Sequence, residues 1–312
     1  MQKLIRQVDE KKGIVQVTVG DERWYFKEGK DPETKNPIML AVPSVTWIAG
    51  HYPKGLQFYR WLAEKGWDEA ESIKVAAGDK GSKVHAAISA IFRGEEVRID
   101  SKYANNSKST AEETVLEELT FEEIQCIQSF LAWRNGLKSF KPLAWDITVF
   151  SEIENYAGTI DLIAEVDGEI YIIDFKTSQY VWTEYELQVS AYRHAVENGE
   201  NVIYEMNPNG TTKDPIKVAN LKTAILQIGY KKNKAGFKFT ELENQFEMFK
   251  IARAIWNRES ASQTPKKVEY PIVLSPAIKF DAPLGKQTTT AEPVTQGVAK
   301  PKVKSKKKDD DF

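Results

Sequence analysis

Hydrophobic and polar residues alternate near the start of the chain and then change to helical spacing. Residues 14–19 and 24–26 alternate on either side of a polar turn, a pattern typical of a β-hairpin. From Ser44, a residue type that often caps helices, apolar and aromatic residues recur every three or four positions as far as Trp67. The spacing predicts a helical segment here, and packing in the core is the favoured role of its aromatic residues.

Capping boxes predict the starts of two further helices. In such a box a Thr side chain and a Glu side chain each bond a free amide of the first turn. Thr120 with Glu123 forms one box and Thr240 with Glu243 forms the other, and apolar residues follow both at helical spacing. We therefore expect helices to begin at both positions.

Two apolar runs in the middle of the chain each lie next to an aspartate. Asp161 is in the first run, and Asp174 ends the second run 13 residues later. The Asp-Gly pair at 167–168 lies between them and is a strong signal for a tight hairpin turn. The pattern predicts two paired strands of about five residues each, a common strand length, with both carboxylates close together because neighbouring strands lie about 5 Å apart.

Lys176 follows Asp174 on the same face of the strand, since side chains alternate with a period of two. Two carboxylates are ligands that Mg²⁺ prefers, the carbonyl of Phe175 offers another oxygen, and a nearby ammonium stabilises developing negative charge. These residues indicate a metal-dependent site for phosphodiester hydrolysis. A structural Asp–Lys ion pair is the alternative.

The acid-x-Lys triplet alone is weak evidence, because several other triplets in the chain have the same form. Only the triplet at 174–176 follows a run of strand-forming residues and has a carboxylate on the preceding apolar run. The others include triplets that begin at Asp9, Glu28, Glu33 and Asp100.

Composition is that of an ordinary globular protein, with 312 residues of which 41% are hydrophobic and 28% charged. The single cysteine, Cys126, excludes an intramolecular disulfide and a cysteine-based metal cluster, which favours a reducing cytoplasm. No apolar run approaches the length of a membrane span, so we expect no membrane association. The pattern predicts one domain over residues 1–275, with the hairpin and the helical segment at its start, and a disordered tail over residues 276–312.

Charge is unevenly distributed. The net charge is −2, and residues 276–312 carry eight Lys against five acids, so the remainder is at −5. Residues 211–238 carry seven Lys and one Asp around a strand-like stretch, which suits contact with a polyanionic backbone, although a solvated hairpin is the alternative. The candidate phosphate contacts are Lys231, Lys232, Lys234 and Lys238.

The motifs occur in the order His85 on a helix after a glycine-rich turn, then Asp161, then Asp174-Phe-Lys176, then Gln188-x-x-x-Tyr192. This series resembles the PD-(D/E)xK nuclease superfamily, and within it the RecB-like and Cas4-like exonuclease branch. The similarity extends from Pro43 to Trp256.

The resemblance implies an α/β fold with a restriction-endonuclease-like core, in which a mixed central β-sheet is flanked by α-helices. It implies Mg²⁺ or Mn²⁺ held by His85, Asp161, Asp174 and the Phe175 carbonyl. Lys176 would be the catalytic lysine. Gln188 and Tyr192 would contact DNA, and Glu152 is a candidate additional acid, with Glu154 equally placed.

One cysteine cannot hold the iron–sulfur cluster of some relatives, and the chain lacks a phosphate-binding loop for ATP. We therefore expect a stand-alone, phage-type DNA exonuclease that acts on free, single-stranded ends in replication, recombination or repair, in a bacterial or phage-infected cytoplasm. The alternatives are a catalytically silent DNA-binding accessory protein and a structure-specific endonuclease. The aromatic residues at 56–67 would line a groove for a strand if they do not pack in the core.

The last residues, Asp309 to Phe312, form an acidic tip that ends in an aromatic ring. They are similar to the tips by which single-stranded-DNA-binding proteins recruit partners, which implies a replication or recombination protein as partner. A solubilising end is the alternative.

Overall fold

The computed structural model describes residues 3–9, 13–19, 22–30, 33–110, 113–217 and 220–260. All of them belong to one compact unit. The tail predicted at 276–312 and its acidic tip lie outside the described residues. Among the described helices, none has the length and apolar character needed to cross a membrane.

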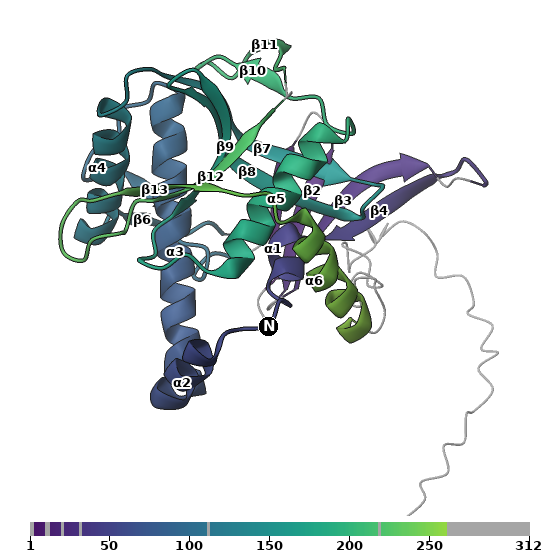
Figure 1. Cartoon of the computed structure of the whole chain (residues 1–312), viewed down its shortest axis with the longest axis horizontal. Helices are drawn as coiled ribbons and strands as arrows, with labels where there is room; N and C mark the ends of the chain where they lie inside the picture. The colour runs from purple at the N-terminus through teal and green to yellow at the C-terminus, as the bar shows by residue number, and fades with distance from the viewer. Residues whose placement is uncertain are drawn as a thin grey trace, which may run out of the picture. The chain divides into compact units, whose positions relative to one another are not determined.

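A mixed five-stranded sheet lies at the centre of this unit (Figure 1). Its strands are β7 (Phe140–Ser151), β8 (Tyr156–Val166), β9 (Glu169–Lys176), β12 (Lys222–Gln227) and β13 (Lys238–Leu242). The order across the sheet is β13-β12-β9-β8-β7, with β9 and β12 parallel and the other neighbours antiparallel. The predicted α/β architecture with a mixed central sheet is confirmed.

Helices cover both faces of this sheet (Figure 1). The described helices are α1 (Val45–Ala49), α2 (Leu56–Lys65), α3 (Trp67–Phe92), α4 (Phe121–Asn135), α5 (Thr183–Glu197) and α6 (Phe246–Glu259), and all except α2 pack on the sheet. Leu162 and Ile173 pack under α3 and α4, whereas Ile163 and Ile172 pack under α1, α5 and α6. The central strands are buried on both faces, which explains why their sequences are nearly continuous apolar runs.

The hairpin of β8 and β9 turns at the predicted Asp-Gly pair. Asp167 has φ 51° and Gly168 has φ 91°, and two positive φ angles are what a tight hairpin turn with the right twist requires. Leu162 pairs with Ile173, so the next opposed positions are Asp161 and Asp174. The strands are longer than expected, with 11 and 8 residues, and the register places both aspartates at the same end of the hairpin.

A second sheet at the start of the chain contains the predicted N-terminal hairpin. Its four antiparallel strands are β1 (Lys3–Asp9), β2 (Ile14–Val19), β3 (Glu22–Lys30) and β4 (Pro37–Pro43). The hairpin of β2 and β3 is confirmed, and a further strand pairs on each side of it. Tyr25 on β3 is buried, and its hydroxyl lies 3.4 Å from Thr159 Oγ1 on β8. This sheet therefore supports the strand that carries Asp161.

Two pairs of very short strands complete the described part of the chain. They are β5 (Lys102–Ala104) with β6 (Leu116–Glu118), and β10 (Tyr204–Met206) with β11 (Thr212–Pro215).

One of the two predicted capping boxes is absent from its expected place. Thr120 and Glu123 form the first box as predicted. Thr240 instead lies within β13, where it pairs with Ile225 of β12, and α6 begins at Phe246 after Gln245. Pairing along the sheet edge gives the backbone of Thr240 its partners, so that a helix does not begin there.

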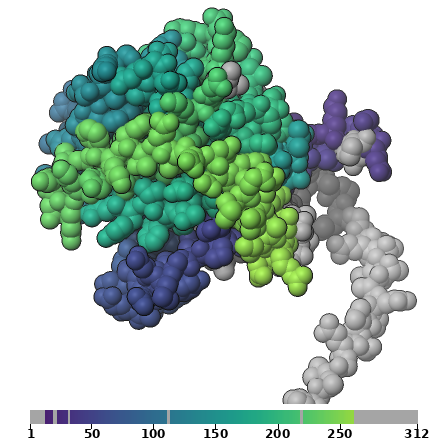
Figure 2. Space-filling model, in the orientation of Figure 1, coloured from purple at the N-terminus to yellow at the C-terminus, as the bar shows by residue number. Residues whose placement is uncertain are grey.

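The aromatic segment at 56–67 does not pack in the core, contrary to the favoured prediction. Ser44 caps α1, which is only five residues long, and α2 follows as a separate helix. None of the ten residues of α2, all of them described, is buried. Helix α2 packs against α3 instead of the central sheet, and Figure 2 shows this part of the chain as a lobe at the lower edge of the view.

A buried ion pair joins α3 to α4. Lys83 Nζ lies 3.0 Å from Glu123 Oε2, and each side chain is 4% exposed. Glu123 also accepts a hydrogen bond from the Thr120 amide, at 2.7 Å, within the capping box. The pair therefore fixes α3 two residues before His85.

Replacing Lys83 by Met should destabilise the protein by about 3 to 5 kcal/mol, because the Glu123 carboxylate would remain buried without its partner. Urea unfolding measures this loss. The double variant Lys83→Met, Glu123→Gln should recover most of the lost free energy, because it removes the unpaired charge. A single variant as stable as the parent would show that the pair does not hold the two helices together.

Candidate active site

The place where the pairing of β8 with β9 ends brings the two predicted aspartates into one cluster. Asp161 is one position beyond the last residue of β8 that pairs with β9, and Asp174 is opposite it. The amide of Phe175 donates to Asp161 Oδ2 at 2.8 Å, which ties the two strand ends together. Beyond this point β8 and β9 no longer pair with each other, so side chains take the place of the missing backbone partners.

His85 reaches the same strand ends from α3. Its Nδ1 lies 3.2 Å from Asp161 Oδ1, and its Nε2 lies 3.1 Å from the Phe175 carbonyl oxygen. A carbonyl oxygen only accepts hydrogen bonds, so Nε2 is the donor in the second contact. The imidazole thus lies between two of its three predicted fellow metal ligands, Asp161 and the Phe175 carbonyl.

Asp174 is held by one residue at each of its two oxygens. Gln188 Nε2 on α5 donates to Oδ1 at 3.2 Å, and Lys176 Nζ lies 2.5 Å from Oδ2. Asp174 is 2% exposed, and the Lys176 ammonium is the partner of its Oδ2. Oδ2 therefore already faces a cation, and a metal bound there would share this oxygen with Lys176 or displace it.

Throughout this cluster, burial and the opposite charges nearby shift the pKa values of the side chains in opposite directions. Burial raises the pKa of Asp174 to about 6, although Lys176 opposes the rise. For Lys176, burial lowers the pKa, but Asp174 and Asp161 outweigh it and the net pKa is raised. His85 behaves in the same way: burial lowers its pKa, and Asp161 outweighs burial and raises it. The two aspartates thus create a local negative field that favours cations.

Helix α5 directs Gln188 and Tyr192 toward this cluster. The residues are four apart, so they share one helix face, and Gln188 Nε2 also donates to the Tyr192 hydroxyl at 2.8 Å. A Cβ on Gly158 would lie 2.5 Å from Tyr192 Cε1, which explains the need for glycine on β8. Gln188 and Tyr192 are 8% and 2% exposed, so their direct contact with DNA stays a prediction that this arrangement does not favour.

The residues of the cluster fit a divalent metal chemically. Carboxylate oxygens and a backbone carbonyl are ligands that Mg²⁺ and Mn²⁺ prefer, and buried Asp174 Oδ2 already faces a positive charge, the Lys176 ammonium. Within the described ranges, no three His, Cys, Asp or Glu side chains stand ready as a preformed metal site. Instead, His85 is bonded to Asp161 and to the Phe175 carbonyl, so these donors satisfy one another.

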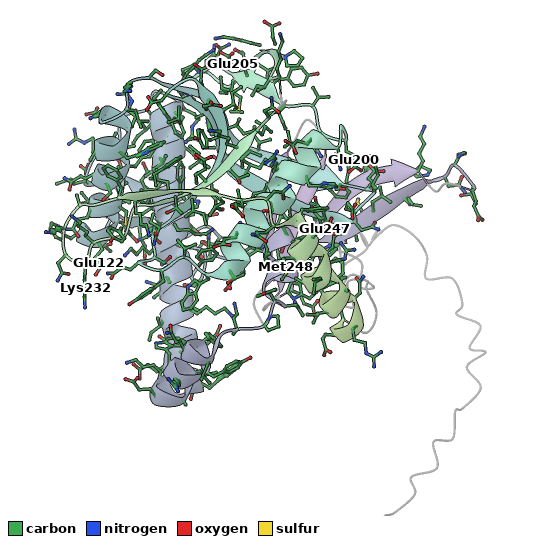
Figure 3. The ribbon with its side chains drawn as sticks, viewed as in Figure 1. Glu122, Glu200, Glu205, Lys232, Glu247 and Met248 are labelled. Carbon is green, nitrogen blue, oxygen red and sulfur yellow. The ribbon has the colours of Figure 1, made fainter. Side chains whose placement is uncertain are left out.

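Other predicted site residues lie outside this cluster. Glu152 pairs with Lys27 of the N-terminal sheet at 2.8 Å, and its role as an additional acid of the site stays a prediction. Lys231, Lys232 and Lys234 lie between β12 and β13, and Lys238 begins β13. Lys232 lies beside Glu122 of α4 and lowers the pKa of that carboxyl, although the Lys80 hydrogen bond lowers it more (Figure 3). The roles of these lysines in binding phosphate stay predictions.

Two residues near the cluster had escaped the sequence analysis. The ring of Tyr185 contacts Lys176, the predicted catalytic lysine, and its centroid lies 4.4 Å from Lys176 Nζ. It is one helical turn before Gln188, so the helical spacing was the available signal. Asp146 lies on β7 at the position opposite Asp161, where the pairing of β7 with β8 is interrupted, and its φ is 52°. It interacts electrostatically with Asp161 and His85. A left-handed backbone conformation at an aspartate within a strand gives no signal in the sequence.

A family model of the PD-(D/E)XK nuclease superfamily matches residues 55–272, more than half of the chain. The chain belongs to this superfamily. Its members are generally nucleases, which are hydrolases, and they typically use divalent metals such as Mg²⁺ or Mn²⁺. The N-terminal sheet lies outside the matched residues. A search of curated proteins returned no match to this chain.

The contact between Tyr185 and Lys176 predicts a matched pair of variants. Tyr185→Phe keeps the ring and should cleave DNA within about twofold of the parent rate. Tyr185→Leu removes the attraction between the ring and the ammonium and should lower kcat about tenfold, with KM little changed. Circular dichroism should show the same fold in both variants. Equal activity of the two variants would show that the aromatic face does not position Lys176.

Proposed function

We propose that this protein is a Mg²⁺- or Mn²⁺-dependent DNA exonuclease of the RecB-like branch. It would hydrolyse phosphodiester bonds at free, single-stranded ends during replication, recombination or repair. The observation that carries this proposal is the convergence of His85, Asp161, Asp174 and Lys176 where the pairing of β8 with β9 ends.

The metal would be held by Asp161, Asp174, the Phe175 carbonyl and His85. When bound, it supplies charge neutralisation at the phosphate and activation of water at neutral pH. Gln188 occupies Asp174 Oδ1, whereas Oδ2 faces the Lys176 ammonium and is the oxygen that the metal would share with Lys176. The imidazole of His85 must turn away from the Phe175 carbonyl for that carbonyl to serve as a ligand.

Lys176 would orient the attacking water or stabilise the negative charge that develops on the phosphate. Its ammonium is attracted by both aspartates, which keeps it charged, and it rests on the Tyr185 ring. A fixed cation costs little reorganisation when the phosphate charge increases. Tyr192 would act through Gln188 by holding the amide that orients Asp174.

Exonuclease activity is inferred from the order of the motifs, His85, Asp161, Asp174-Phe-Lys176 and Gln188-x-x-x-Tyr192, which is similar to that of the RecB-like branch. Lys231, Lys232, Lys234 and Lys238 would hold the phosphate backbone of the strand. The N-terminal sheet would act as a support for β8, because Tyr25 contacts Thr159 there.

Alanine at Asp174 or Lys176 should abolish Mg²⁺-dependent cleavage of linear single-stranded DNA. The same chain offers a matched control, because Asp100 and Lys102 form a triplet of the same acid-x-Lys form. Their side chains are 61% and 58% exposed and pair with Arg98 and Glu118 at the surface. Asp100→Ala and Lys102→Ala should retain parental rates. Near-parental cleavage by Asp174→Ala or Lys176→Ala would refute the assignment of the site.

The need for a free end predicts a contrast between linear and circular DNA. End-labelled linear single strands should be degraded progressively, whereas covalently closed circles of the same sequence should remain intact, since they offer no end. Gel electrophoresis of both substrates with Mg²⁺ measures the difference. Cleavage of circles at the linear rate would instead indicate an endonuclease, and tight DNA binding without any hydrolysis would indicate an accessory protein.

A further inference from the structure

Two exposed aromatic rings stand beside the candidate active site. They belong to Tyr180 and Trp182, on the segment that joins β9 to α5, four and six residues after Lys176. Tyr180 is 70% exposed and Trp182 is 37% exposed, and their ring centroids are 6.2 Å apart. Large aromatic surface that remains exposed next to a reactive site indicates a surface for binding.

The backbone beneath these rings is fixed from several sides. Gln227 Nε2 on β12 donates to the Ser178 carbonyl at 3.3 Å, and the Ser178 hydroxyl donates to the Tyr180 carbonyl at 2.8 Å. The Tyr185 amide donates to the Trp182 carbonyl at 2.9 Å. Hydrogen bonds therefore hold the segment 178–182 in place, and this segment exposes the two rings to solvent.

A second group of aromatic rings lies on α2. Phe58 lies 5.6 Å from Tyr59 and 5.9 Å from Trp61 between ring centroids. Lys54 connects the two groups, because its ammonium pairs with Glu184 at the start of α5 and lies 5.8 Å from the Phe58 ring centroid. The Lys54–Glu184 pair neutralises Glu184, the acidic residue nearest to Trp182 in sequence. This reduces the repulsion of a negatively charged DNA strand.

We propose that Tyr180 and Trp182 form a stacking platform for the unpaired bases next to the phosphate that is cleaved, and that Phe58 and Tyr59 extend it. Every base has a flat π face, so stacking on aromatic rings binds a single strand without regard to sequence. Bases within a duplex are already stacked and paired, so they cannot use the platform. The platform thus selects single-stranded ends, and this inference rests on the proposed nuclease function.

Binding to a short, labelled single-stranded oligonucleotide tests the platform apart from cleavage. Fluorescence anisotropy with Ca²⁺ in place of Mg²⁺ gives Kd for the parent and for each variant. Tyr180→Ala and Trp182→Ala should each raise Kd about tenfold, and Tyr180→Phe should stay within about twofold of the parent. Tyr204→Ala removes a ring on β10 that is 44% exposed and should leave Kd unchanged.

An oligonucleotide that lacks bases near its end identifies the partner of the rings. The parent should bind this abasic strand about tenfold more weakly than the intact strand, whereas Tyr180→Ala, Trp182→Ala should bind both alike. Equal loss of affinity for intact and abasic strands in the alanine variant would overturn the proposal. So would unchanged DNA binding with a change in sedimentation, which would assign the rings to contact between copies of the chain.

Cleavage assays on the parent protein distinguish a failure of the nuclease function from a failure of the stacking platform. If the parent binds intact strands in preference to abasic ones but hydrolyses neither with Mg²⁺ or Mn²⁺, the nuclease function fails and the platform stands. If the parent cleaves both strands with equal kcat/KM, the nuclease function stands and the platform fails.

Discussion

A buried and a half-buried carboxylate at the end of one hairpin are the constraint on which the site depends. Asp161 and Asp174 are brought to opposed positions by the register of β8 and β9, and their like charges disfavour each other in a buried place. Such a pair is stable only with positive charge nearby. His85 and Lys176 supply that charge here, and a divalent metal would supply it in the active protein.

The layered fold delivers these compensating groups from opposite sides of the sheet. Helix α3 brings His85 from one face, and α5 brings Gln188 and Tyr185 from the other. The Lys83–Glu123 pair fixes the first helix, and the contact of Tyr192 with Gly158 sets the distance of the second. The arrangement therefore depends on side chains well outside the motif that carries the chemistry.

The sequence predicted those parts of the site that local patterns determine. The Asp-Gly turn fixes the register of the hairpin, and with it the meeting of Asp161 and Asp174. Parts that depend on tertiary contacts were missed or misjudged. Thr240 reads as a helix cap but pairs in β13, and α2 has the spacing of a core helix but remains exposed. Glu152 is a candidate because of its position in the sequence, and the structure pairs it with Lys27, a contact that the sequence does not predict.

The most direct test of the account is to locate the metal. Crystals of the parent protein soaked in Mn²⁺ should give an anomalous difference peak within bonding distance of Asp161, Asp174 and the Phe175 carbonyl, with the His85 imidazole moved off that carbonyl. Absence of a peak there, or a peak only at another place on the protein, would contradict the claim that these carboxylates form a metal site.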